Sequence, residues 1–79
     1  MTNVRLTAVV WREGSGYVSQ CPELGVASYG DGPREAVEAL RQAAELYLAN
    51  AKALGMLDEI EPALHAAERY ATSIDVAIA

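Results

Sequence analysis

The only cysteine, Cys21, and the only histidine, His65, are the first residues of this sequence that could do chemistry. A thiolate becomes a nucleophile when a nearby histidine or a helix N-terminus lowers its pKa. His65 lies far from Cys21 in the sequence, and no third residue is placed to orient the pair. Unpaired cysteines in small domains are mostly small apolar residues at strand ends. We therefore predict that Cys21 is structural and is not a catalytic nucleophile.

The segment Gly30-Asp31-Gly32-Pro33 stands just before a predicted helix, where an anion could bind the helix N-terminus. A phosphate-binding loop needs GxxxxGK[ST], and this segment has neither the lysine nor the hydroxyl. Asp31 would repel phosphate, and Pro33 removes one N–H donor. We interpret the segment as a turn followed by a helix N-cap.

Metal and acid–base chemistry are not indicated either. One cysteine and one histidine cannot build a closed zinc site, and the acids lack calcium-loop spacing. A paired-carboxylate nuclease needs acids that converge from the strands. The predicted strands offer only Asp75, while Glu13, Glu23 and Asp31 fall at turns or strand ends. We predict no catalytic residue, no metal and no cofactor, so we expect a protein that is not an enzyme.

Charge bears on the class of partner. Trp11 and the four tyrosines could stack bases, but base-stacking sites are accompanied by Lys and Arg. The net charge is −5, and residues 58–79 carry five acids against one arginine. Because nucleic-acid affinity comes mainly from phosphate neutralisation, a basic protein partner is favoured over a nucleic acid. A surplus of acid that serves only solubility is the alternative.

Three short strands are predicted from the period-two alternation of apolar residues. They cover residues 4–11, 17–21 and 26–30. Gly14 and Gly16 in the first connection are expected to supply the positive φ angles of a tight hairpin. Pro22 cannot donate to a sheet ladder and should end the second strand. Tight connections between consecutive strands predict an antiparallel meander.

Two helices are predicted after the strands. Pro33 suits the first position of a long helix, with Gly32 or Asp31 as N-cap and Gly55 just past the last turn. A shorter helix is predicted from Asp58 to Glu68. Its apolar face consists of Ile60, Leu64 and Ala67.

The C-terminal residues 72–78 alternate again, with Ile74, Val76 and Ile78 on one side, and predict a last strand in the same sheet. The order β-β-β-α-(α)-β is an α+β fold, with an antiparallel sheet of three to four strands covered by one long helix. A chain of 79 residues makes one domain, 1–79. We find neither a signal-peptide pattern nor an apolar stretch able to cross a membrane, and expect a cytoplasmic protein without membrane contact.

Four segments, in their order and spacing, resemble the HicB-like antitoxin family. They are Gly16-Tyr17-Val18, Cys21-Pro22-Glu23-Leu24, Gly30-Asp31-Gly32-Pro33-Arg34-Glu35-Ala36 and Glu45-Leu46-Tyr47-Leu48. The resemblance implies a partly degraded ribonuclease-H-like fold that has lost its catalytic residues. It also implies a homo-oligomer, either a dimer or a tetramer.

HicB-like proteins typically neutralise a small toxin that cleaves mRNA, by covering its active surface. The resemblance implies that this chain binds and occludes a basic toxin of the HicA type. Acids in the predicted second helix are the expected contacts, and we assign Glu59, Glu61 and Glu68 to them. Many relatives add a C-terminal DNA-binding segment; here the sequence ends at the predicted last strand, so we expect no direct DNA binding. The alternative function is a stand-alone oligomeric scaffold or regulator with no toxin partner.

Overall fold

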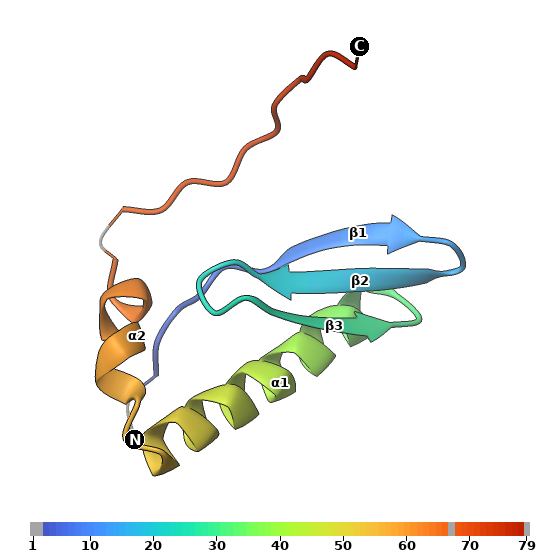
Figure 1. The fold of residues 1–79 in the computed structure, drawn as a ribbon. Coiled ribbons are helices and arrows are strands. Elements are labelled where there is room, and N and C mark those ends of the chain that lie inside the picture. Colours follow the sequence, from blue (N-terminus) through green and yellow to red (C-terminus); the bar gives the residue numbers. More distant parts are fainter. Residues whose placement is uncertain (1–2, 67, 79) are drawn as a thin grey trace.

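Three antiparallel strands followed by a long and a short helix make up the computed structural model, which describes residues 3–66 and 68–78 (Figure 1). The strands are β1 (Val9–Glu13), β2 (Gly16–Cys21) and β3 (Val26–Gly30), and the helices are α1 (Pro33–Ala53) and α2 (Leu57–Leu64). The strands are hydrogen-bonded in the order β1-β2-β3. The predicted α+β class is confirmed, with three strands in the sheet.

The hairpin between β1 and β2 closes where Glu13 pairs with Gly16. Gly14 has a φ of +64°, as predicted, but Gly16 does not have a positive φ. That expectation for Gly16 was wrong. Gly16 lies under the ring of Tyr29, and a Cβ added to it would lie 2.8 Å from Cε2 of that ring. Gly16 therefore leaves room for the ring of Tyr29, and a larger residue at this position would displace that ring.

The first strand begins later than predicted, at Val9 instead of Val4. Val9 pairs with Gln20, and β2 ends one residue further on, at Cys21, where Pro22 begins the next turn. Residues 3–8 thus run past the end of β2 and have no neighbouring strand. Their alternating pattern is compatible with a strand, but the sheet of this chain provides no partner for them.

Helix α1 begins and ends as predicted. Gly32 is the N-cap, Pro33 occupies the first helical position, and Gly55 just past the helix has a φ of +72°. The N–H of Met56 donates to the carbonyl of Ala51 at 2.8 Å, which closes the last turn.

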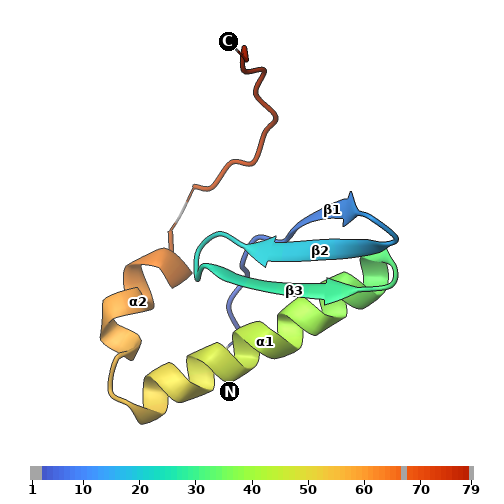
Figure 2. The same ribbon diagram turned by 45° about the vertical axis from the view of Figure 1, so that its right-hand side comes forward.

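The first turn of α1 packs tightly on one face of the sheet, and α1 covers that face only (Figure 2). The buried hydroxyl of Ser19 on β2 donates to the carbonyl of Ala36 at 2.7 Å. A Cβ at Gly30 on β3 would lie 2.7 Å from the carbonyl carbon of Glu35. The buried apolar core consists of Cys21, Ala36, Leu40 and Leu64.

Helix α2 ends at Leu64, so the predicted extension to Glu68 was wrong. Ala67, which was assigned to its apolar face, lies outside the described residues. The N–H of His65 donates to the carbonyl of Glu61, and no helical turn follows in the described residues.

The expected last strand is not formed in this chain. Residues 68–78 contain no strand or helix, and residues 70–78, termed the tail below, lead away from the sheet on the side of β1 (Figure 1). Ile74, Val76 and Ile78 are 78%, 73% and 96% exposed. A strand requires hydrogen bonds to a neighbour, and the tail has none within its own sheet. Among the described residues, no helix combines the length and apolar character needed to span a membrane.

Candidate partner-binding site

The face of the sheet opposite α1 is apolar and is not covered by any helix (Figure 2). Because Ser19 contacts α1, its neighbour Val18 must point to the opposite side of the strand. Val18 pairs with Trp11 on β1 and with Tyr29 on β3, so these three side chains form one row across the sheet. Trp11 is 40% exposed and Tyr29 is 55% exposed. This row, with Val9 beside it, is termed the open face.

Such a surface is suited to contact with another protein. Exposed aromatic side chains on a rigid sheet bury a large apolar area at little conformational cost, which is why Trp and Tyr are enriched at interfaces. The sequence alone does not show that Trp11 and Tyr29 lie together. The alternation of each strand places Trp11 and Tyr29 on a face, but only the register between strands brings them into one row.

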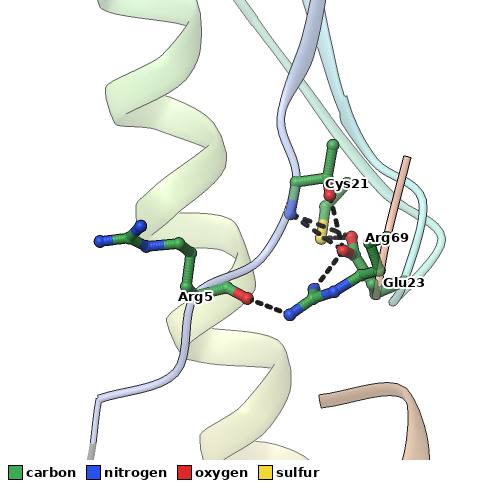
Figure 3. Close-up of polar contacts among 5 residues, drawn as sticks. Arg5, Cys21, Glu23 and Arg69 are labelled. Atoms are coloured by element: carbon green, nitrogen blue, oxygen red, sulfur yellow. Dashed lines mark hydrogen bonds and ion pairs between the residues drawn. The ribbon is translucent and has the colours of Figure 1, made fainter. Parts of the chain in front are cut away.

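A polar cluster at the end of the sheet joins three distant parts of the chain (Figure 3). The carboxylate of Glu23, in the turn after β2, accepts hydrogen bonds from the N–H of Thr7 at 3.0 Å and from its hydroxyl at 2.8 Å. Arg69 forms an ion pair with the same carboxylate and donates to the carbonyl of Arg5 at 2.7 Å. Glu23 therefore holds Thr7 and Arg69 at the turn between β2 and β3, and Arg69 in turn holds the backbone of Arg5 there.

Glu23 is held in its charged form. Its side chain is only 8% exposed. Burial by itself raises the pKa of a carboxyl, but the hydrogen bonds from Thr7 and Arg69 outweigh burial and lower the pKa of Glu23 to about 2. The cluster is thus a partly buried anchor in which the Glu23 carboxylate is fully paired. Sequence reasoning had placed Glu23 only at a strand end, and the residues that surround it come from 16 and 46 positions away in the chain.

Cys21 lies buried at the end of β2, the position predicted for a structural cysteine. Burial raises the pKa of its thiol, and the hydrogen bond to Glu23 and the negative charge of that carboxylate raise the pKa further. The S–H donates to Glu23 at 3.5 Å, while the nearest ionic partner of His65 is Glu61, with Nε2 and Oε1 3.6 Å apart. These environments do not activate a thiolate. Among the described residues, no three His, Cys, Asp or Glu side chains could hold a metal ion together.

An apolar groove lies between residues 3–8 and the two helices. It is an open depression of about 1550 Å³. Its apolar lining consists mainly of Val4, Leu6, Val37, Leu40, Ala44 and Leu48. Val37 is left 42% exposed in it. The groove adjoins the part of the N-terminal segment that continues past β2 without a partner.

The three acids assigned to partner binding do not share one helix face. Glu59 lies on α2 beside a smaller hollow of about 280 Å³, and Glu61, also on α2, lines the groove. Glu68 lies beyond the end of α2 and accepts a hydrogen bond from the hydroxyl of Tyr70 at 3.1 Å. The structure places Glu59 and Glu61 on one short helix and Glu68 on the extended segment after it.

The class of protein defined by this geometry is a small α+β domain with two apolar surfaces, the open face and the groove, and an unpaired tail. No protein-family model, no curated protein and no solved structure matches the chain. Its function is therefore inferred from these surfaces and from the resemblance of its sequence segments.

Proposed function

We propose that this chain is a cytoplasmic, non-enzymatic antitoxin-type protein of the HicB-like class, which binds and occludes a small basic mRNA-cleaving toxin. The observation that carries the proposal is the open face. Its row of Trp11, Val18 and Tyr29 is rigidly held by strand pairing and is not covered by the rest of the described chain. An aromatic row of this kind is suited to anchor a protein partner.

The segments that resemble the family have definite structural roles here, which supports the proposal. Gly16 accommodates the ring of Tyr29, and Gly30 allows α1 to approach β3. Glu23, in the Cys-Pro-Glu-Leu segment, anchors the end of the sheet. The resemblance thus lies at positions where the fold restricts which residue can be present.

Electrostatics favours a basic partner. A toxin that binds RNA carries positive charge on its binding surface. Glu59 is exposed on α2, and Glu61 is partly exposed two residues further along the helix. These acids lie on α2 and not in the open face, but negative charge on the protein still speeds its encounter with a basic protein, mainly through the association rate.

A second candidate is a stand-alone oligomeric scaffold or regulator. The observation in its favour is the tail, whose exposed Ile74, Val76 and Ile78 are suited to contact another protein chain. A scaffold of this kind needs no toxin.

Co-expression with a short basic protein encoded beside this chain tests the proposal. We expect the two proteins to co-purify and the toxicity of the neighbour to be suppressed. Trp11→Glu should abolish both effects because it places a charge in the open face, whereas Leu46→Glu, at an exposed position on α1, should leave both intact. If the unaltered chain shows no co-purification and no rescue of growth, that result would contradict the antitoxin function and favour the scaffold.

A further inference from the structure

A carboxylate lies on the same side of the sheet as the open face. Glu13 pairs with Gly16 and is two residues from Trp11 on β1, so strand alternation places it at the hairpin end of the open face. Arg12 points to the other side of the sheet by the same alternation, and its Nε donates to the carbonyl of Gly14 at 3.3 Å. Glu13 is exposed and has no ion-pair partner among the described residues. The only charge that β1, β2 and β3 place on this side is therefore negative.

The ring of Tyr29 reaches from β3 across β2 and covers Gly16. A Cβ at Gly16 would lie 2.8 Å from Cε2 of this ring, and closer still to its Cζ and hydroxyl oxygen. Because Gly16 pairs with Glu13, the hydroxyl end of Tyr29 lies beside the residue pair that carries the carboxylate. Tyr29 is nevertheless 55% exposed, so the side of its ring turned away from Gly16 faces solvent.

Trp11 lies next to this point on β1. It pairs with Val18 and is the diagonal neighbour of Gly16, and such neighbours are about 7–8 Å apart, within reach of an aromatic side chain. A tyrosine ring, an indole and a carboxylate, all of them exposed, thus surround one point above Gly16. Aromatic faces attract cations, and a carboxylate adds a charge-assisted hydrogen bond.

A partner that covers the open face and its hairpin end also removes water from Glu13. Covering a carboxylate with an apolar surface costs free energy unless an opposite charge is supplied. No cation of the three strands lies on this side to supply it, because Arg12 points to the other side. The partner must therefore bring the positive charge to this point.

We infer that the hairpin end of the open face binds one arginine side chain of a protein partner. The guanidinium stacks on the exposed side of the Tyr29 ring beside Trp11 and forms an ion pair with Glu13. Arginine is favoured over lysine because its planar guanidinium is weakly hydrated, stacks on aromatic rings and offers a fork of donors that matches a carboxylate. The inference rests on the proposed function, since it names the group by which the open face recognises a basic partner.

N-acetyl-arginine amide is the probe, titrated into the full chain at constant ionic strength and followed by nuclear magnetic resonance. Trp11 is the only tryptophan, so its indole N–H signal reports directly on the open face. We expect the signals of Trp11 and Tyr29 to shift together. N-acetyl-lysine amide should bind about threefold more weakly. The neutral isostere N-acetyl-citrulline amide should bind about tenfold more weakly, because it loses both the cation–ring attraction and the ion pair.

Glu13→Gln and Glu35→Gln form a matched pair of variants. Each removes one exposed carboxylate, but Glu35 lies in the first turn of α1, which covers the other side of the sheet (Figure 2). Glu13→Gln should weaken binding of the arginine probe about fivefold, whereas Glu35→Gln should leave it unchanged. Tyr29→Leu, which keeps an apolar surface without a ring, should also weaken binding about fivefold. Circular dichroism checks that the three variants keep the secondary structure of the unaltered chain.

Three results would overturn the inference: no shift of the Trp11 signal, equal binding of the arginine and citrulline probes, or equal effects of the two glutamine variants. The titration contains no toxin, so it is separate from the test of the proposed function. Arginine binding without capture of a basic neighbour would contradict the antitoxin function and leave the arginine site standing. Capture of the neighbour without arginine binding would support the antitoxin function and remove the arginine site.

Discussion

Arg69 and Glu23, which are 46 positions apart in the sequence, form an ion pair at the end of the sheet. The same guanidinium donates to the carbonyl of Arg5 at 2.7 Å. One side chain therefore joins the C-terminal segment to both the N-terminal segment and the turn between β2 and β3 (Figure 3). This contact fixes the point from which the tail leaves the body of the protein.

Replacing Glu23 by Gln should destabilise the fold by roughly 2 kcal/mol at neutral pH. The substitution removes the charge that Arg69 and Thr7 stabilise and leaves Arg69 without its ionic partner. Urea unfolding followed by circular dichroism measures the change. Glu13→Gln, at an exposed position in the hairpin, is the control and should change stability by less than about 0.5 kcal/mol. Equal effects of the two substitutions would show that the anchor contributes nothing.

The contribution of Glu23 should depend on pH in a defined direction. Its folded pKa of about 2 lies below the ordinary value of 4.5. The stabilisation is therefore complete above about pH 4.5 and is lost as the pH falls toward 2. The difference in unfolding free energy between the unaltered chain and Glu23→Gln should shrink over this window. Measuring the difference cancels the titration of the other acids; a difference that stays constant down to pH 2 would contradict the assigned pKa.

Cys21 should react slowly with thiol reagents in the folded protein. Its thiol is buried and its pKa is raised, so little thiolate is present at mildly alkaline pH. We expect the rate with Ellman's reagent to be at least about tenfold lower than in denaturant. Rapid labelling of the folded chain would show that Cys21 is accessible and reactive, contrary to its structural role.

Gly30→Ala should be among the more damaging small substitutions, costing about 3 kcal/mol. The new Cβ would collide with the backbone of α1, at 2.7 Å from the carbonyl carbon of Glu35 and 2.9 Å from Cα of Ala36. Gly25→Ala is the matched control, because Gly25 has open space around it and a φ of +69°. It should cost only about 1 kcal/mol through backbone strain. Thermal unfolding of both variants shows which substitution lowers stability more, and a larger loss for Gly25→Ala would contradict the prediction.

Reversing the charge of the acids around α2 should slow binding of a basic toxin. Glu59→Lys and Glu61→Lys should each lower the association rate about tenfold at low salt and weaken its salt dependence, with Glu68→Lys acting in the same direction. Asp31→Lys, just before the N-cap of α1, is the control and should change the rate much less, because α2 follows the other end of α1. Stopped-flow kinetics at several salt concentrations provide the measurement. Unchanged kinetics in all three variants would remove these acids from the interface.

Much of the fold was predictable because its signals are local. Pro22 ended β2, Gly32 and Pro33 began α1, and Gly55 followed its last turn, as the sequence indicated. Each of these residues acts through its own backbone geometry, which needs no knowledge of distant segments. The position of Cys21 at the end of β2 followed for the same reason, since it directly precedes Pro22.

The sequence by itself determined which segments can form a strand or a helix, and where local turns must occur. It could not determine whether residues 4–8 and 72–78 have a partner, because strand pairing is a contact between segments distant in the chain. Tertiary structure alone aligned Trp11 with Tyr29 across β2 and brought Arg69 to Glu23. An alternating pattern predicts the capacity for a strand, whereas its hydrogen bonds depend on what the fold places beside it.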